Sequence, residues 1–252
     1  MTKIISIANQ KGGVGKTTTT INLATALAAI EKKTLIIDAD PQGNATTGLG
    51  IPESQRAPSL YEALTESAFD KNYIKNTLIP NLDIIPSTQD LAASEIELAE
   101  EKERETKIKK ILSNIGDYDF VLIDCPPALG LLTINSLVAS NSVLIPLQCE
   151  FFALEGLSAL TSTIEAIRSG FNSKIELEGV VLTMYDKRNS LSHLVEQDVR
   201  SHFKNKVYKT IIPRNVRISE APSHGKPVLI YDTSCVGSQA YISLAKELIF
   251  NQ

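Results

Sequence analysis

A glycine-rich turn between an apolar strand and a helix constrains this chain more than any other stretch. Residues 9–18 have the sequence NQKGGVGKTT and follow the mostly apolar, β-prone residues 4–8. After them, residues 19–30 carry apolar side chains at helical spacing. Glycines allow backbone N–H groups to approach phosphate oxygens, and a helix N-terminus adds partial positive charge. The stretch therefore predicts a phosphate-binding loop.

Two lysines and a threonine give this loop its expected chemistry. Lys16 is expected to reach the terminal phosphates of a bound nucleotide, and the Thr17 hydroxyl to ligate Mg²⁺. The loop departs from the usual pattern G-x-x-x-x-G-K-[ST], because Gln10 stands at the first glycine position and Lys11 follows it. A second lysine near the phosphates is expected only where negative charge is concentrated.

Two further apolar strands end in carboxylates. Residues 33–38 form a predicted buried strand that ends at Asp38, with Asp40 close behind, and residues 118–124 form another that ends at Asp124. In an open parallel sheet, ligands bind beyond the carboxyl ends of the strands. Asp124 has the Walker B position and is expected to face the metal's water shell. We expect Asp38 to support Mg²⁺ or its waters, and Asp40 to orient or activate the attacking water.

The alternation of apolar strands with helical segments predicts an α/β fold with a doubly wound, mainly parallel sheet flanked by helices. The 252 residues are expected to form one P-loop domain, residues 1–252. The other expected strands span residues 82–86, 142–147 and 177–182. The other expected helices span residues 58–64, 87 to about 112, and 238–250.

The composition excludes several classes of protein. Three widely spaced cysteines, with no C-x-x-C pair, predict neither a disulfide framework nor a zinc site. They fit a reducing compartment. The sequence shows no cleavable signal, and no apolar run approaches the ~20 residues of a membrane span. We therefore expect a cytoplasmic protein without stable membrane association.

Residues 11–18, KGGVGKTT, resemble the deviant Walker A motif of the ParA/MinD group of P-loop ATPases. The resemblance runs essentially end to end and is to small chromosomal ParA (Soj-like) partition ATPases. It implies slow ATP hydrolysis with ATP and Mg²⁺ as cofactors, and a sandwich homodimer in which Lys11 reaches the partner's nucleotide. Pro213 and Asn215 are implied to hold the adenine. The implied catalytic residues are Lys11, Lys16, Asp40 and Asp124. The implied nucleotide contacts in the loop are Lys11, Gly12, Gly13, Val14, Gly15, Lys16, Thr17 and Thr18, and the implied metal site is Thr17, Asp38 and Asp124.

The charge distribution changes sign late in the chain. Residues 185–230 contain nine basic and four acidic residues, whereas the whole chain has a net charge of −4. Such a basic face could neutralise DNA phosphates without reading bases, or form a mixed solvated surface. The resemblance favours nonspecific double-stranded DNA, a ParB-type centromere-binding partner that stimulates hydrolysis, and a nucleoid-associated location. The residues chosen for DNA contact are Lys187, Arg188, Arg217 and Lys226.

Three other functions compete with DNA partition. A MinD-like membrane-associated ATPase would need a basic amphipathic helix at the C-terminus, but Lys246 there has Glu247 beside it. A nitrogenase-reductase-like electron carrier would need a cluster between subunits, for which Cys125 and Cys149 are the only plausible pair. A DNA-binding protein that holds nucleotide with little turnover differs from an ATPase only in degree, and replacement of Asp40 would discriminate between the two.

Overall fold

The computed structural model describes residues 2–66 and 69–250. A seven-stranded sheet with the order β3-β4-β2-β5-β1-β6-β7 forms its centre. Neighbouring strands pair in parallel, except that β3 pairs antiparallel with β4 at one edge. The strands are β1 Lys3–Ile7, β2 Thr34–Asp38, β3 Lys75–Asn76, β4 Leu82–Ile85, β5 Phe120–Asp124, β6 Ser142–Gln148 and β7 Glu176–Thr183. The predicted doubly wound, mainly parallel sheet is therefore confirmed.

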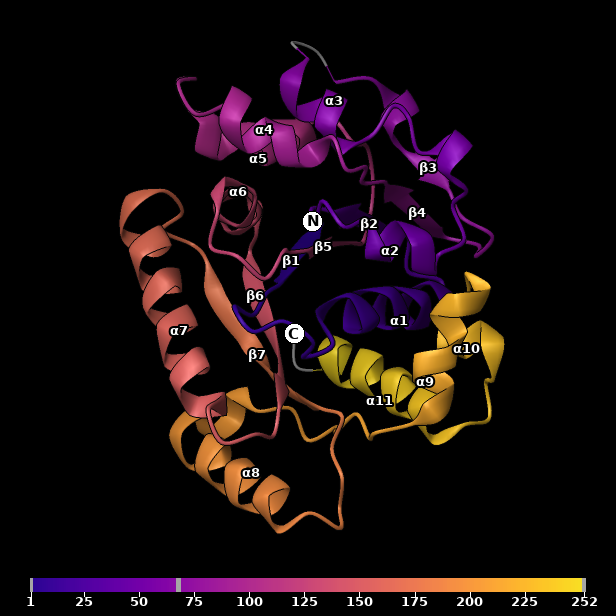
Figure 1. Ribbon diagram of the computed structural model, residues 1–252, viewed down its shortest axis with the longest axis vertical. Helices are drawn as coiled ribbons and strands as arrows, with labels where there is room; N and C mark the ends of the chain where they lie inside the picture. Colours follow the sequence, from indigo (N-terminus) through magenta and orange to yellow (C-terminus); the bar gives the residue numbers. More distant parts are fainter. Residues whose placement is uncertain (1, 67–68, 251–252) are drawn as a thin grey trace.

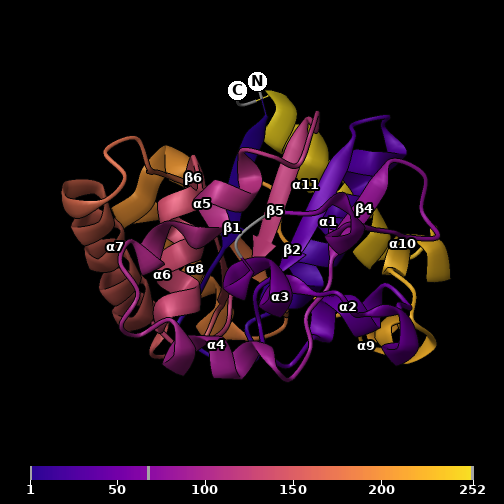
Figure 2. The same ribbon diagram turned by 90° about the horizontal axis from the view of Figure 1, so that it is seen from above.

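Helices cover both faces of this sheet, as Figures 1 and 2 show with α7 and α11 on opposite sides of the strands. Alternate residues of one strand enter different cores: Leu35 and Ile37 pack on one face, and Ile36 packs on the other. Burial on both faces explains why the strands are continuous apolar runs. The helices are α1 Lys16–Ala29, α2 Asn44–Gly48, α3 Leu60–Thr65, α4 Leu91–Glu97, α5 Lys107–Leu112, α6 Leu131–Ala139, α7 Ala153–Gly170, α8 Ser190–Phe203, α9 Val216–Glu220, α10 Val228–Tyr231 and α11 Val236–Phe250.

The long charged helix expected from residue 87 to about 112 is wrong. Helix α4 ends at Glu97, and the chain turns before α5 begins at Lys107. Within the turn, Glu103 has a left-handed backbone with φ of 57°. Residues 100–106 have no apolar side chain to pack on the core, and four of them are glutamates. Because packing supplies most helical stability in proteins, this run has little to hold it helical.

Two glycines join distant parts of the chain through a direct backbone contact. Gly50 follows α2, and Gly225 lies in the turn between α9 and α10. Both have positive φ, 74° and 61° respectively. A Cβ at Gly50 would lie 2.7 Å from the carbonyl oxygen of Gly225, and a Cβ at Gly225 would lie 2.9 Å from the Cα of Gly50. The contact therefore requires glycine on both sides.

Candidate nucleotide site

The loop between β1 and α1 lies at the carboxyl edge of the sheet, where β1 is flanked by β5 and β6. Asn9 fixes the start of this loop, since its Nδ2 donates to the Pro146 carbonyl at 2.8 Å and its Oδ1 accepts from the Lys11 N–H at 3.0 Å. Gly15 is the N-cap of α1, with φ of 88°. A glycine cap has no side chain that could occupy the N–H groups at the start of the helix. Those donors are therefore available to an anionic ligand.

Thr183, the last residue of β7, supports the loop from behind. Its hydroxyl donates to the Val14 carbonyl at 2.7 Å. It also packs against Gly15, where an added Cβ would lie 3.8 Å from the Thr183 Cβ. The bond gives the Val14 carbonyl a partner, and we infer that this helps keep the loop N–H groups directed at the ligand.

Lys16 is buried among carboxylates. It is 7% exposed, and its Nζ donates to the Lys11 carbonyl at 3.2 Å. Burial lowers the pKa of Lys16, while the nearby charges of Asp124 and Asp40 act in the opposite direction. The ammonium group retains further donors, because a lysine carries three and one hydrogen bond uses one.

Asp38 and Asp124 are direct neighbours in the parallel register of β2 and β5, and both are fully buried. Burial raises the pKa of Asp38 to about 6, although the Thr46 N–H and hydroxyl donate to its Oδ2 at 2.8 and 2.7 Å. Burial, followed by the charge of Asp38, raises the pKa of Asp124 to about 8. Two carboxylates so placed favour a cation between or beside them.

One oxygen of this pair is suited to a metal ion. The Thr20 hydroxyl donates to Asp124 Oδ1 at 3.0 Å, but Asp124 Oδ2 has no hydrogen-bond partner among the described residues. Buried polar atoms are nearly always partnered, so an unpaired buried carboxylate oxygen fits a hard divalent cation. No cluster of three or more His, Cys, Asp or Glu side chains in residues 2–66 and 69–250 could hold a metal. The Thr17 hydroxyl and ligand phosphates would therefore complete the coordination.

These groups adjoin a pocket of about 520 Å³. Val14, Asp38 and Asp124 are buried and do not line it, and Lys11 points elsewhere. Asp40 lies on its wall, with Oδ1 accepting the Gln42 N–H at 3.0 Å. The pocket brings together these predicted residues: Gly12, Gly13, Gly15, Lys16, Thr17, Thr18, Asp40, Pro213 and Asn215.

Sequence reasoning missed several residues of this pocket. Thr183 could have been found, because it is a polar residue that closes an apolar strand at the same edge as Asp38 and Asp124. Tyr241 gave no signal, since it is one apolar-facing position of α11; its hydroxyl lies 3.4 Å from the Thr19 hydroxyl. The other missed residues lining the pocket are Gln42, Asn44, Pro127, Met184, Ile212, Arg214, Ile218, Ser219 and Pro222.

Lys11 extends over the surface instead of into its own pocket. Its Nζ forms an ion pair with Glu150, and both side chains are nearly half exposed. Directly after Glu150, Phe151 and Phe152 are 78% and 65% exposed and contact each other edge to face. Large exposed aromatic side chains are typical of protein interfaces.

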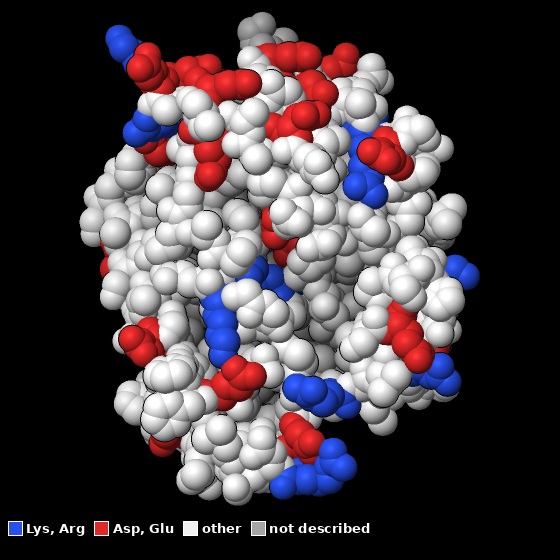
Figure 3. Space-filling view, in the orientation of Figure 1, with Lys and Arg blue, Asp and Glu red and all other residues white. Residues whose placement is uncertain are grey.

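The four residues predicted for DNA come from three separate segments, and all four are exposed. Lys187 and Arg188 lie in the β7–α8 loop, Arg217 on α9 and Lys226 before α10. Both arginines form ion pairs within the chain. On the face drawn in Figure 3, acidic side chains gather over α3, α4 and α5, while most basic side chains lie in the lower half.

The C-terminal helix α11 uses its apolar face inside the protein. Tyr241, Leu244 and Leu248 are buried in the core against α1. Glu247 accepts hydrogen bonds from the backbone N–H groups of Lys209 and Thr210 at 2.7 and 2.9 Å. None of the helices in the described residues is both long enough and apolar enough to span a bilayer.

Comparisons with known proteins match most or all of this chain. A family model described as an AAA domain matches residues 2–177. The chain is 56% identical to the chromosome partitioning protein ParA of Caulobacter vibrioides strain NA1000, over 98% of this chain and 94% of that protein. It is 52% identical to the sporulation initiation inhibitor protein Soj of Bacillus subtilis strain 168, over 100% of both chains.

A solved structure also shares the fold of the whole chain. Cobyrinic acid a,c-diamide synthase from Mycobacterium smegmatis, with bound ADP and magnesium, has a TM-score of 0.87 and 34% sequence identity. The match covers 99% of this chain and 94% of that chain. Since relatives that are 48–56% identical over 98–100% of this chain are named as ParA or Soj proteins, this chain belongs to the ParA/Soj family of chromosome-partitioning proteins.

Proposed function

We propose that this protein is a Mg²⁺-dependent ATPase of DNA partition. Two copies bind two ATP molecules between them, and this dimer holds double-stranded DNA without sequence preference. A ParB-type centromere-binding partner stimulates hydrolysis, which releases the DNA. Such a cycle would operate on the nucleoid, in the cytoplasm. The observation that carries the ATPase assignment is the buried Asp124 Oδ2 beside the phosphate-binding loop, which has no hydrogen-bond partner within residues 2–66 and 69–250.

The chain's own residues divide the work on the nucleotide. The N–H groups of residues 12–18 and the Lys16 ammonium would bind the phosphates. Pro213 and Asn215, which line the same pocket, would contact the base. Thr17 and Asp124 would hold Mg²⁺, and Asp38 fixes the loop that carries Asp40 through its bonds to Thr46. A bound Mg²⁺ would neutralise charge that develops on the phosphate oxygens during transfer.

We assign the hydrolytic step to Asp40. It lies at the pocket wall and is only 7% exposed, with one carboxylate oxygen fixed by the Gln42 N–H. A carboxylate held there can orient a water and accept its proton as it attacks the terminal phosphate. Because Asp40 is not bonded to Lys16 in this structure, the two groups can act on different atoms of the nucleotide.

The outward direction of Lys11 supports the dimer. In its own subunit the ammonium pairs with Glu150 and does not line the pocket, so a phosphate of a second subunit is a suitable partner. The exposed Phe151 and Phe152 beside it provide apolar surface for the same contact. A partner phosphate would replace a half-exposed carboxylate, which holds lysine weakly.

A single experiment tests the dimer and its link to DNA. The Asp40→Ala variant is sized by light scattering with ATP and Mg²⁺, with ADP, and without nucleotide, each with and without plain duplex DNA. We expect dimers only with ATP, and DNA bound only to the dimers. A protein that stays monomeric at saturating Mg·ATP would contradict the proposal.

A further inference from the structure

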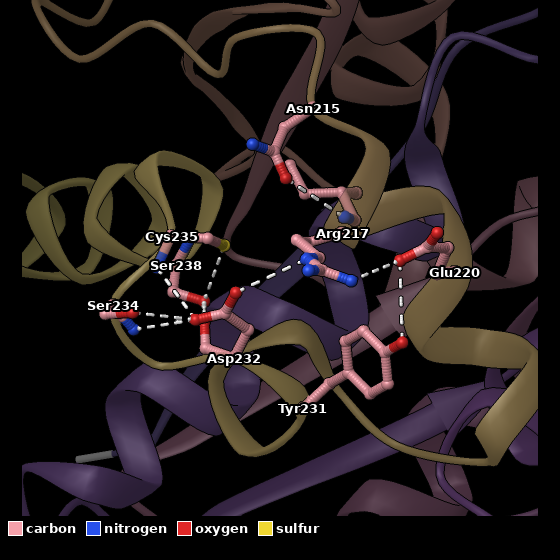
Figure 4. A network of polar contacts seen from close by, with 9 residues as sticks. Asn215, Arg217, Glu220, Tyr231, Asp232, Ser234, Cys235 and Ser238 are labelled. Carbon is pink, nitrogen blue, oxygen red and sulfur yellow. Dashed lines mark hydrogen bonds and ion pairs between the residues drawn. The ribbon is translucent and has the colours of Figure 1, made fainter.

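Arg217, one of the two arginines proposed for DNA, is held by two carboxylates from different segments (Figure 4). Its Nη1 lies 3.0 Å from Glu220 Oε2, one turn along α9, and its Nε lies 3.5 Å from Asp232 Oδ2, just before α11. A phosphate is usually bound through the same donors of the guanidinium group. The two carboxylates therefore occupy donors that DNA would use.

The carboxylates of this cluster also have partners other than Arg217. Asp232 Oδ1 accepts from the Ser234 N–H at 3.2 Å, the Ser234 hydroxyl at 2.9 Å and the Cys235 N–H at 3.1 Å. The Tyr231 hydroxyl lies 3.5 Å from Glu220 Oε2. Asp232 is therefore held by its own loop, whereas Glu220 has only the long contact with Tyr231 besides Arg217 (Figure 4).

Arg188, the second arginine, is held in the same manner. Its Nε and Nη2 donate to the two oxygens of Asp186 at 3.0 and 2.8 Å, and its backbone N–H donates to Asp186 Oδ1 at 3.0 Å. The Arg188 side chain is 89% exposed, so Asp186 pairs with its donors without burying it. Both proposed DNA arginines thus have acidic partners in the single chain.

These pairs reduce the positive charge that the two arginines offer to DNA. One guanidinium and two carboxylates around Arg217 carry a net negative charge, and the Arg188 pair is neutral. Ion pairs this exposed are weak, so a DNA phosphate can displace them when other contacts hold DNA nearby. Ion pairs of this strength can break when DNA binds and form again when it leaves.

The helix that carries Arg217 also forms part of the nucleotide pocket. Asn215 is the N-cap of α9, with Oδ1 accepting the Ile218 N–H at 3.4 Å, and Asn215, Ile218 and Ser219 all line the pocket. A base bound in the pocket would contact the same five-residue helix that carries Arg217 and Glu220. Nucleotide binding could therefore change the position of this helix.

We propose that Glu220 and Asp232 on Arg217, and Asp186 on Arg188, form a charge latch that keeps the DNA affinity of the nucleotide-free monomer low. The latch rests on the proposed function. DNA binding requires phosphates to replace these carboxylates. The acids are therefore positioning residues that make DNA binding depend on the nucleotide-bound dimer.

Asp232→Asn is the sharpest test, because the amide oxygen can still accept from Ser234 and Cys235 while the amide nitrogen no longer attracts Arg217. Glu220→Gln and Asp186→Asn are independent variants. Glu165→Gln is the matched control: Glu165 pairs with Arg168 at i,i+3 on α7, as Arg217 pairs with Glu220 on α9, and its loss changes the net charge equally.

Affinity for a random-sequence duplex is measured by fluorescence anisotropy without nucleotide, with ADP and with ATP, over a series of salt concentrations. We expect each latch variant to bind DNA several-fold more tightly without nucleotide, and to depend less on ATP. The slope of log K against log salt should steepen by about 0.9 for each further phosphate that the variant neutralises. Glu165→Gln should behave as the unchanged protein does.

Weaker binding by Asp232→Asn and Glu220→Gln, similar to that of Arg217→Ala, would overturn the latch, because the acids would then prepare the arginine for DNA. An unchanged affinity and slope would also overturn it. If Arg217→Ala weakens DNA binding while the latch variants have no effect, only the latch fails. If no variant and no nucleotide state binds DNA, the proposed function fails as well.

Discussion

The nucleotide site and the proposed DNA surface handle phosphate charge in opposite ways. At the nucleotide site, Lys16 is buried beside carboxylates, and one oxygen of Asp124 is left without a partner among the described residues. On the proposed DNA surface, Arg188 and Arg217 are exposed and already paired with acids. The first site is fixed by the strands of the sheet, whereas the second is carried by a loop and a five-residue helix.

This difference indicates that the nucleotide site provides tight binding, whereas the proposed DNA surface provides binding that can be regulated. Buried groups that are fixed before binding lose little entropy when a ligand arrives. Their electrostatic interactions with the ligand are also stronger, because the surroundings have a low dielectric constant. Exposed ion pairs can be exchanged at small cost and are screened by salt. We therefore expect substitutions in the nucleotide site to have large effects and substitutions on the DNA surface to have small, salt-dependent ones.

The largest effect is expected for Asp40→Ala. Loss of a positioned general base typically slows a reaction by ~10²–10⁴-fold, so turnover should fall by at least about a hundredfold. ATP binding and dimer formation should persist. Steady-state phosphate release and an equilibrium ATP-binding assay check both parts, with Asp198→Ala on α8 as a control. Persistent turnover would show that Asp40 is not the hydrolytic residue.

Lys16→Ala should weaken ATP binding by roughly 10- to 100-fold, because hydrogen bonds to charged groups contribute about 1.5–3 kcal/mol. DNA association should be lost with it. Lys11→Ala is the informative partner variant: its ammonium pairs with Glu150 outside the pocket. It should leave ATP binding by the monomer intact and abolish the dimer. Titration with a fluorescent ATP analogue measures the affinity, and equal losses in both variants would place Lys11 in its own site.

Thr183→Val should weaken ATP binding by about tenfold, because the variant leaves the Val14 carbonyl without its donor, a loss of about 1–3 kcal/mol. The same titration measures this. Thr163→Val on α7 also removes a hydroxyl, one that bonds only to its own helix at 3.1 Å, and should change nothing. A lower melting temperature with unchanged ATP affinity would limit Thr183 to a structural role.

The smallest effect is expected for Arg188→Ala, a few-fold loss of affinity for nonspecific duplex. The slope of log K against log salt should fall by about 0.9, as expected when the protein neutralises one phosphate fewer. ATPase activity without DNA should be unaffected. Lys110→Ala on α5, which removes an equal charge beside Glu103, is the control. A flat salt response would reject phosphate binding at this surface.

Much of the nucleotide site could be predicted because its parts are local in sequence. A glycine-rich loop follows one strand, and Asp38 and Asp124 end two others, so the parallel sheet alone brings them to one edge. Thr183 follows the same rule and was missed only because threonine has no distinctive chemistry. Tyr241 reaches the pocket through the packing of α11 on α1, which no local pattern encodes.

The sequence-based prediction was wrong or incomplete where tertiary contacts determine the local structure or the partner of a charged group. The charged run after α4 turns because nothing apolar in residues 100–106 anchors it, although its composition favours a helix. The count of charges over residues 185–230 included Arg217 among the cations, but its partner Asp232 lies just beyond that window. The packing of α9, α10 and α11 brings this acid to the guanidinium group.

The touching glycines 50 and 225 restrict how this protein can change. Neither position can accept a methyl group, because the other's backbone fills that space, and both backbones are left-handed. A smaller residue at the facing position cannot compensate, because that position is already glycine. Substitution at either position, or at both, should therefore disrupt the contact. This contact joins the segment that follows Asp40 to the segment that follows Arg217.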